Sequence, residues 1–396
     1  MKYSKTINPL ILIIDAGTTN VKVFLIDKGL NILDKDTIRV KKKFPQKGWV
    51  EQDSEEIFKS VVNLLQKIIK KNKNQRKQII GLGITNQRET TICWDKKTTK
   101  AIYPAIVWED KRTLKLCTVL SKKVSAQKIK RKTGLNLTPY FSASKVNWII
   151  ENVPKVKTLI PKNRLAFGTV DSWIVFKLTG GKSHMTDYTN ASRTLLFNIK
   201  TLRWDKELLS LFKIPQNILP EVKSSFSFFG HLDKNVIGLD IPILAIIGDQ
   251  QASLYAAGTQ LSTTKITYGT GAFILQNLGE NFYLNKHLFT TLAVGIKNKP
   301  VYAFEGKVAE CGDLITPALG NDKEMKKVTK KIALKVNELL HYFPRNYNKI
   351  VVDGGVSQAE LLVAEQEKIS QMKIQRQKYF EGTAIGTAKL IFDNLK

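Results

Sequence analysis

The sequence contains one short pattern twice, about 250 residues apart: an apolar strand, a turn of small residues, and a second strand. In both copies the turn is rich in Gly and Thr, and the flanking stretches have the apolar, β-branched composition of buried strands. The first copy occupies residues 10–27 and the second residues 265–275. Such a repeat predicts an internal duplication, with two halves that face each other across a cleft and a boundary near residue 250.

Other apolar stretches predict further strands, at residues 79–84, 241–247 and 349–353. Helical periodicity predicts helices over residues 55–71, 252–258 and 384–392. Asp53 or Ser54 is the expected N-cap of the first of these helices. The chain is therefore expected to fold as an α/β protein. Its 396 residues are enough for two or three domains.

The chain is strongly basic, with 63 Lys and Arg residues against 34 Asp and Glu residues, which gives a net charge of +29. This charge raises the alternative of a nucleic-acid-binding protein. However, only ten of the basic residues are Arg, the residue favoured for bidentate recognition of phosphates and bases, and the lysines are spread along the whole chain. We therefore interpret the charge as a compositional bias and expect no dedicated nucleic-acid site.

The composition also excludes several classes of protein. Apolar residues make up 43% of the chain, which is too many for a mostly disordered protein. The three cysteines form no CxxC pair, so a reducing compartment is expected. The four histidines are scattered and have no metal-ligand spacing. No stretch approaches the roughly 18 apolar residues of a membrane span. We expect a cytoplasmic protein without membrane insertion.

The first Gly-Thr turn is a candidate phosphate site. Gly17 lets the backbone approach a ligand, and Thr18 and Thr19 offer hydroxyl and amide donors. The alternative is an ordinary hairpin turn. The second turn, at residues 269–271, and the Asp-Gly-Gly turn at residues 353–355 favour phosphate binding over that alternative.

Charged residues after two other strands are candidates for chemistry. Asp249 lies between a strand and a helix, where α/β proteins place ligands, and is either a general base or a helix N-cap. Arg88 and Glu89 are adjacent and either bind neighbouring hydroxyls or form a solvated ion pair. Trp108 and Tyr140 are either ligand contacts or packed aromatics, and spacing alone does not decide between these roles.

Longer stretches of the sequence carry a resemblance to a known family. They are DAGTT at 15–19, GWVEQD at 48–53, GLGITNQRETTICW at 81–94, YPAIVWEDKRT at 103–113, TGLNLTPYFSASKVNWI at 133–149, FGTVDSWIVFKLTGG at 167–181, TDYTNASRTLLFNI at 186–199, IGDQQASLYAAG at 247–258, YGTGAFIL at 268–275 and VDGGVS at 352–357. On these stretches the chain resembles the FGGY carbohydrate kinase family, within the actin/hexokinase/Hsp70-like superfamily. NQRET, PYFS, DYTNASRT and GDQQA are similar to the glycerol-specific branch of that family.

The resemblance implies an α/β fold of two ribonuclease H-like domains, also called actin-like ATPase domains, around a central cleft, with the second domain truncated. The substrate-binding domain would occupy residues 1–251 and the nucleotide-binding domain residues 252–396. The family has several dozen more residues where this chain has only residues 313–352, so the second domain is expected to be internally deleted there.

The resemblance also implies a role for each matching residue. Substrate contacts would be Arg88, Glu89, Trp108, Tyr140, Asp249, Gln250 and Phe273. Asp249 would also be the catalytic base, and Asp15 would lie near Mg²⁺. Nucleotide contacts would be Thr18, Thr19, Asn20, Lys22, Thr270, Gly312 and Gly355.

Some positions differ from the family pattern. Asn20 replaces a usual Ser, and Lys22 replaces the Arg of bacterial members. Thr316 replaces a Gln that contacts the nucleotide, and Ala359 replaces an Asn near the adenine. Because Thr316 and Ala359 lack the amide groups of the family residues, we expect weaker binding of the adenine than of the phosphates.

The implied function is ATP-dependent phosphorylation of glycerol to sn-glycerol 3-phosphate, with ATP and Mg²⁺ as cofactors. One alternative is a degenerate, inactive relative, which the deletion suggests. A second is a kinase of another small polyol or sugar, against which the glycerol-type motifs argue. We also expect a homo-oligomer.

Overall fold

The computed structural model describes residues 8–269, 271–295, 299–309, 311–315, 317, 320–344 and 349–395. The chain divides into two compact units. One consists of Met1–Asp249 with Thr387–Lys396, and the other of Gln250–Gly386. The expected domains, residues 1–251 and 252–396, stay a prediction. The last ten residues belong to the first unit, whereas the predicted boundary places them in the second.

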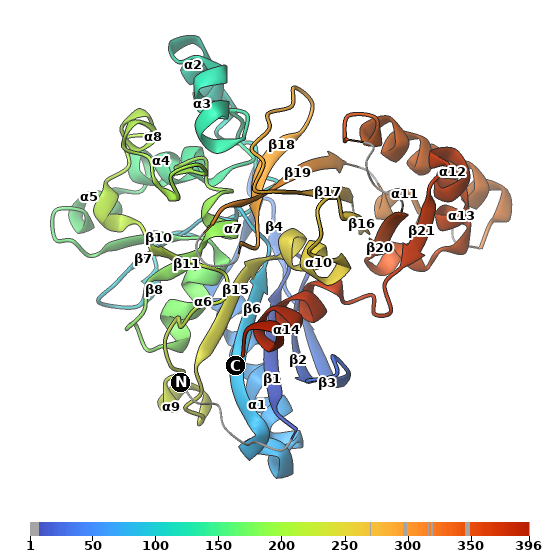
Figure 1. Ribbon diagram of the computed structural model, residues 1–396. Helices are drawn as coiled ribbons and strands as arrows, with labels where there is room; N and C mark the ends of the chain where they lie inside the picture. The colour runs from blue at the N-terminus through green and yellow to red at the C-terminus, as the bar shows by residue number, and fades with distance from the viewer. Residues whose placement is uncertain are drawn as a thin grey trace. The chain divides into compact units, whose positions relative to one another are not determined.

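The first unit contains a five-stranded sheet in the order β15-β6-β1-β2-β3. Its strands are β1 (Leu10–Ala16), β2 (Asn20–Asp27), β3 (Ile32–Arg39), β6 (Ile79–Asn86) and β15 (Ile243–Gly248). β1, β6 and β15 run parallel, whereas β2 pairs antiparallel with β1 and β3 (Figure 1). The carboxyl ends of the three parallel strands therefore meet at one edge of the sheet, which is where α/β proteins bind ligands.

The predicted strands and the first helix are confirmed. All residues of β1 are buried, as expected for a strand inside a parallel sheet. Helix α1 (Ser54–Lys71) buries one apolar face against β2 and β3, and Asp53 is its N-cap. The Asp53 carboxylate accepts hydrogen bonds from the backbone N–H groups of Glu55, at 2.8 Å, and Glu56, at 3.3 Å. These bonds satisfy two of the amides that a helix start leaves unpaired.

Outside the large sheet and α1, the first unit forms short helices and small sheets, most of them between β6 and β15. The helices are α2 (Leu114–Lys123), α3 (Ala126–Thr133), α4 (Ser142–Asn152), α5 (Pro154–Leu159), α6 (Val170–Leu178), α7 (Tyr188–Ala191), α8 (Lys206–Leu211) and α9 (Lys234–Ile237). The strands of the small sheets are β4 (Lys42–Lys43), β5 (Glu51–Gln52) and β9 (Ala105–Ile106); β7 (Ile92–Asp95), β8 (Lys100–Ala101) and β10 (Leu165–Gly168); β11 (Met185–Asp187) and β14 (Glu221–Lys223); and β12 (Phe197–Asn198) and β13 (Arg203–Trp204). The short 3₁₀ helices Lys73–Gln78 and Gln216–Ile218 complete this region.

The second unit has a six-stranded sheet in the order β18-β19-β17-β16-β20-β21. Its strands are β16 (Thr264–Tyr268), β17 (Ala272–Gly279), β18 (Phe289–Ala293), β19 (Val301–Val308), β20 (Lys349–Asp353) and β21 (Lys373–Arg376). Its helices are α10 (Asp249–Ala257), whose first residue belongs to the first unit, α11 (Gly312–Ile315), α12 (Asp322–Leu340), α13 (Glu360–Ser370) and the 3₁₀ helix Gly355–Gln358. Helix α14 (Gly382–Asn394) begins in this unit and ends in the first.

The two sheets repeat one strand order. In the second unit, β16 pairs antiparallel with β17 and parallel with β20, and β20 is parallel to β21. In the first unit, β1 likewise pairs antiparallel with β2 and parallel with β6, and β6 is parallel to β15. β19 takes the place of β3, and β18 is an addition at the edge. The predicted duplication of the strand–turn–strand pattern is therefore confirmed at the level of sheet topology. None of the described helices combines the length and apolar composition that a bilayer span requires.

Candidate active site at the strand ends of the first unit

Polar residues follow each of the three parallel strands of the first unit. β1 ends beside Asp15 and leads into the turn that contains Thr18, β6 leads into Gln87 and Arg88, and β15 leads into Asp249. Because the parallel strands are neighbours in the order β15-β6-β1, these residues lie at one edge of one sheet. The candidate site is built from this edge.

Arg88 and Asp249 form an ion pair across the ends of β6 and β15. The distance from Arg88 Nε to Asp249 Oδ1 is 3.1 Å. The Arg88 side chain is only 2% exposed, whereas the Asp249 side chain is 27% exposed. The buried guanidinium argues against the solvated ion pair that was the alternative for Arg88. The Asp249 carboxylate is thus partly accessible to solvent, and its ion pair with the buried Arg88 guanidinium fixes its position.

Glu89 is held in an uncommon backbone conformation. Its φ is +38°, in the left-handed region that residues other than Gly seldom adopt. Its buried carboxylate accepts a hydrogen bond from Arg193 Nε at 2.6 Å, and its carbonyl accepts one from Ser142 Oγ at 3.0 Å. Such backbone strain persists only where the surroundings over-determine it, and it is frequent at functional sites.

Two aromatic rings stand beside these charges. Trp108 and Tyr140 contact each other edge to face, with ring centroids 5.5 Å apart and an interplanar angle of 62°. The backbone N–H of Trp108 donates to Thr90 Oγ1 at 3.3 Å, so this ring is tied to the segment that carries Arg88 and Glu89. Together the rings can form an apolar wall against the carbon chain of a small polyol.

The turn after β1 is tied to the same segment. The Thr18 hydroxyl accepts from Trp108 Nε1 at 2.9 Å and donates to Gln87 Oε1 at 3.2 Å. Gln52 Nε2 donates to the Thr18 carbonyl at 2.7 Å, and Gln87 Nε2 donates to Gln52 Oε1 at 2.8 Å. The hydroxyl of Thr18 therefore has protein partners, and the predicted nucleotide role of this residue stays a prediction.

The other predicted nucleotide residues of the first unit lie close to this turn. Thr19 is exposed, and its carbonyl accepts from the Val40 N–H at 3.0 Å. Asn20 and Lys22 are half-buried on β2, and Lys22 is directly opposite Asp15 in the β1–β2 register. A nucleotide role for all three stays a prediction.

Asp15 is a suitable Mg²⁺ ligand by its chemistry. It is the penultimate residue of β1 and is 9% exposed. Within the described residues no three His, Cys, Asp or Glu side chains gather as a metal cage. Mg²⁺ in phosphotransferases usually needs only one or two carboxylates, because phosphate oxygens and waters complete its coordination. Asp15 supplies one such carboxylate, and a metal role for it stays a prediction.

The remaining predicted site residues lie in the second unit. Gln250 Oε1 accepts from the buried Lys265 Nζ at 2.6 Å. Phe273 is half-buried on β17, with Lys307 Nζ 5.4 Å from its ring centroid.

Gly312 and Gly355 each begin a short helix. The Gly312 N–H donates to the Gly269 carbonyl at 2.9 Å, and the space where a Gly355 side chain would lie is open. Thr270 and Thr316 lie outside the described residues. The structure therefore brings Arg88 and Asp249 together in the first unit, and it places Trp108 against Tyr140. Gln250, Phe273, Gly312 and Gly355 belong to the second unit.

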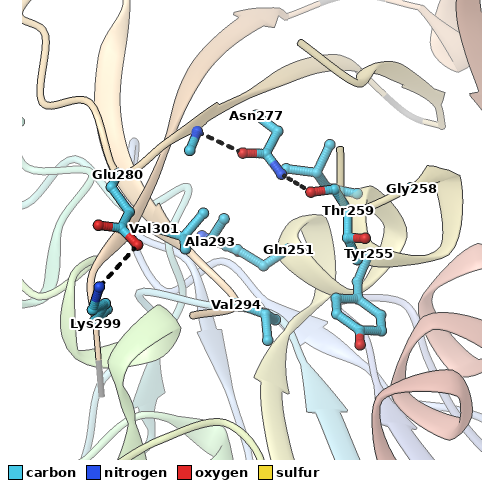
Figure 2. A pocket seen from close by; sticks show the side chains of 12 residues that line it. Gln251, Tyr255, Gly258, Thr259, Asn277, Glu280, Ala293, Val294, Lys299 and Val301 are labelled. Atoms are coloured by element: carbon cyan, nitrogen blue, oxygen red, sulfur yellow. Dashed lines mark hydrogen bonds and ion pairs between the residues drawn. The ribbon is translucent and has the colours of Figure 1, made fainter. Parts of the chain in front are cut away.

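The second unit also contains a cavity of about 270 Å³ (Figure 2). Its walls include Leu254, Ala293 and Val301, and an exposed ion pair joins Glu280 and Lys299 at 3.6 Å. Figure 2 also shows Asn277, whose amide donates to the Thr259 carbonyl at 3.1 Å. None of the predicted site residues lines this cavity, so it gives no support to the predicted site.

Several residues that build the site were not singled out by sequence reasoning. They are Gln52, Gln87, Asp187, Asn190 and Arg193, which hold the site residues or the strands that carry them. Each one belongs to a stretch that resembles the family, which was the only signal in the sequence. Local periodicity gave no indication of them.

Comparisons with known proteins agree with this geometry. The model of the N-terminal domain of the FGGY family of carbohydrate kinases matches residues 10–256. A glycerol kinase of Aquifex aeolicus is 46% identical over 85% of this chain and 68% of its own length. Glycerol kinase 2 of Sulfolobus acidocaldarius is 36% identical over 96% of this chain and 88% of its own length.

Among solved structures, the glycerol kinase of Plasmodium falciparum with ADP matches with a TM-score of 0.91 and 32% identity. The match covers 97% of this chain and 89% of that one. The fold is thus the α/β actin-like ATPase fold of these kinases. The chain spans 61–68% of the length of three bacterial glycerol kinases that it matches.

Proposed function

The chain belongs to the FGGY family of carbohydrate kinases, and on that premise we propose that it transfers the γ-phosphoryl group of ATP to glycerol. The product would be sn-glycerol 3-phosphate. The observation that carries this proposal is the buried Arg88 paired with the partly exposed Asp249, beside Glu89 and the Trp108–Tyr140 wall. Two proteins that match 96% and 97% of this chain, at 36% and 32% identity, are glycerol kinases.

The substrate would bind through its hydroxyls and its carbon chain. Arg88 can only donate hydrogen bonds, and an ionised Glu89 can only accept them, so the two can bind neighbouring hydroxyls of one polyol. The rings of Trp108 and Tyr140 would contact the carbons. This small set of contacts fits a three-carbon polyol better than a longer sugar.

Asp249 would act as the general base. As the hydroxyl oxygen of glycerol attacks the γ-phosphorus, its proton passes to the Asp249 carboxylate and ADP leaves with the electrons of the broken P–O bond. Phosphoryl transfer depends on positioning and on neutralising charge, so the fixed Arg88–Asp249 geometry serves the reaction directly. Mg²⁺, when bound, would neutralise charge on the phosphate oxygens, and Asp15 is the carboxylate that would hold it.

The nucleotide would be bound mostly by the second unit. Gly355 places no side chain in the way of a phosphate, so its backbone N–H group can donate to it. The Gly312 N–H already donates to the Gly269 carbonyl, so Gly312 would contribute only a close approach of the backbone. Ala359 offers no side-chain hydrogen bond to an adenine ring. We expect the phosphates to contribute more to ATP binding than the base does.

A substrate panel tests the proposed function. The purified full chain, with Mg²⁺ and ATP, is assayed for ADP release with glycerol, xylulose and gluconate. We expect glycerol to give the highest kcat/KM. A five-carbon ketose that outperforms glycerol would support the alternative of a different sugar kinase, and no turnover of any substrate would support an inactive relative.

A further inference from the structure

A buried carboxylate lies behind the candidate site. Asp187 is the last residue of β11 and the N-cap of α7, and it is fully buried. Its two oxygens accept five hydrogen bonds, from Thr189 N, Thr189 Oγ1 and Ser225 Oγ to Oδ2, and from Asn190 N and Asn190 Nδ2 to Oδ1. A buried carboxylate with this many donors is fixed in one orientation, because any rotation would leave polar groups unpaired.

One chain of hydrogen bonds runs from this carboxylate to the end of β15. The Thr189 hydroxyl donates its only proton to Asp187 Oδ2 at 2.7 Å. Its oxygen must therefore act as an acceptor toward other groups, and it accepts from the Gly248 N–H at 2.8 Å. Gly248 directly precedes Asp249, so this chain ends one residue from the proposed base.

A second chain runs to the end of β6. Asn190 Nδ2 donates to Asp187 Oδ1 at 2.9 Å and to Asn86 Oδ1 at 3.2 Å. Asn86 Nδ2 donates back to Asn190 Oδ1 at 3.0 Å and to the Gln87 carbonyl at 2.8 Å. The Gln87 carbonyl belongs to the peptide that leads into Arg88. This chain therefore ends at the other partner of the Arg88–Asp249 pair.

We propose that Asp187 is a positioning residue that sets the distance between Arg88 and Asp249 through Thr189 and Asn190. This inference rests on the proposed function, because it assigns Asp187 a part in the same reaction. The five hydrogen bonds of the Asp187 carboxylate go to other residues, so it acts on Arg88 and Asp249 only by fixing the strand ends that carry them. Thr189 and Asn190 each contact the carboxylate and one strand end, so each can be altered separately.

The consequence for the reaction is specific. A displacement of about 1 Å at a reacting group lowers a rate by about 100-fold, even when the altered residue is remote from the chemistry. Loss of the hydroxyl at Thr189 would release the end of β15 and move Asp249 relative to Arg88. The predicted result is a lower kcat, with little change in the KM for ATP.

The experiment compares two buried threonines. Thr189→Val removes the hydroxyl between Asp187 and Gly248 and preserves the side-chain shape. Thr133→Val is the matched control, because Thr133 is also fully buried. Its hydroxyl donates to the Ile129 carbonyl and accepts from the Leu135 N–H, so it has the same number and kind of hydrogen bonds. Thr189→Ser keeps the hydroxyl and tests for rescue.

We expect Thr189→Val to lower kcat by about 10- to 100-fold. Thr133→Val should leave kcat within about threefold of the wild-type value, while it lowers Tm about as much as Thr189→Val does. Thr189→Ser should recover most of the rate that Thr189→Val loses. Equal kcat losses in the two valine variants, or no recovery with Ser, would overturn the proposal and leave Asp187 with a role in folding alone.

Crystal structures of wild type and Thr189→Val supply a readout that does not depend on activity. We expect the Arg88 Nε–Asp249 Oδ1 distance to change by about 0.5 Å or more in the variant. An unchanged distance would contradict the positioning role. If the wild-type chain does not phosphorylate glycerol, the proposed function fails, and this distance still decides the positioning proposal.

Discussion

The two units share a strand order but differ in the residues that come directly after their parallel strands. After β6 the first unit continues with Gln87-Arg88-Glu89, whereas after the corresponding β20 the second unit continues with Gly354-Gly355. The first sequence places charged side chains at the edge of the sheet, and the second leaves bare backbone there. The same strand order therefore carries different chemical groups in the two units, and we propose a polyol site for the first set and phosphate contacts for the second.

The carboxylates of the two units also differ. Asp249 pairs with Arg88 and is partly exposed. Asp353, at the end of β20, is 2% exposed and accepts hydrogen bonds from Ser253 Oγ at 2.7 Å and Thr267 Oγ1 at 2.5 Å. The hydroxyl donors hold Asp353 inside its own unit, so it serves the structure of the turn. Of these two carboxylates, only Asp249 can receive a proton from a bound ligand.

The largest effect should come from the partly exposed carboxylate. Asp249→Asn keeps the size of the side chain and removes its basicity. We expect kcat to fall by about 10²–10⁴-fold, while glycerol still binds. Steady-state kinetics with glycerol measure the fall, and a variant with near-normal kcat would refute the assignment of the base.

The next effect concerns the buried partner of that carboxylate. Arg88→Ala removes the donor that would bind a glycerol hydroxyl, and we expect the KM for glycerol to rise about tenfold or more. Arg164→Ala is the matched control, because Arg164 pairs with Asp95 in the same unit and has no predicted contact with substrate. A similar rise in KM in both variants would show that Arg88 acts only on the stability of the fold.

A smaller effect separates the two glycines that follow β20. Gly354 has φ +86°, and a Cβ there would lie 2.4 Å from the Tyr268 carbonyl oxygen, whereas nothing lies within 4 Å of a Cβ at Gly355. We expect Gly354→Ala to lower the free energy of unfolding by about 1–3 kcal/mol. Gly355→Ala should leave stability within about 0.5 kcal/mol and raise the KM for ATP. If Gly355→Ala leaves the KM for ATP unchanged, this backbone does not contact the nucleotide.

The last effect is a pH dependence in the first unit. Burial, opposed by hydrogen bonds from Thr169 and Thr186, raises the pKa of Asp171 from 3.8 to about 7. Between these pH values the folded chain holds a proton that the unfolded chain has lost, so this residue lowers the stability of the fold as the pH rises.

Asp171→Asn cannot titrate. We therefore expect the unfolding free energy of this variant, compared with that of wild type, to increase by up to about 1.4 kcal/mol per pH unit from pH 4 to pH 7. Denaturant unfolding at several pH values measures this difference. A constant difference across the range would show that Asp171 is ionised throughout.

The sequence predicted seven of the eleven strands that the structure describes in the two large sheets. It also placed Arg88 and Asp249 each after an apolar strand. Their ion pair was not predicted, because local patterns do not give the order of strands in a sheet. The N-cap at Asp53 was a local signal. Helix α10 begins at Asp249, three residues before the predicted start, because the polar residues that precede the Ala-rich stretch are already helical.

The supporting contacts could not be predicted, because they join residues distant in sequence. Glu89 and Arg193 are 104 residues apart, as are Asn86 and Asn190. Sequence reasoning treated Glu89 as the neighbour of Arg88, and it did not foresee the positive φ that accompanies the Arg193 contact. Pairings of this kind depend on the tertiary fold, and no local periodicity encodes them.

Identification of the product would show whether this chain phosphorylates glycerol with Asp249 as the base. The full chain and the Asp249→Asn variant are each incubated with glycerol, ATP and Mg²⁺ and followed by ³¹P NMR. We expect wild type to convert the γ-phosphate resonance of ATP into that of glycerol 3-phosphate, and the variant to do so at least about 100 times more slowly. Release of inorganic phosphate without glycerol 3-phosphate, or equal rates in the two proteins, would contradict this expectation.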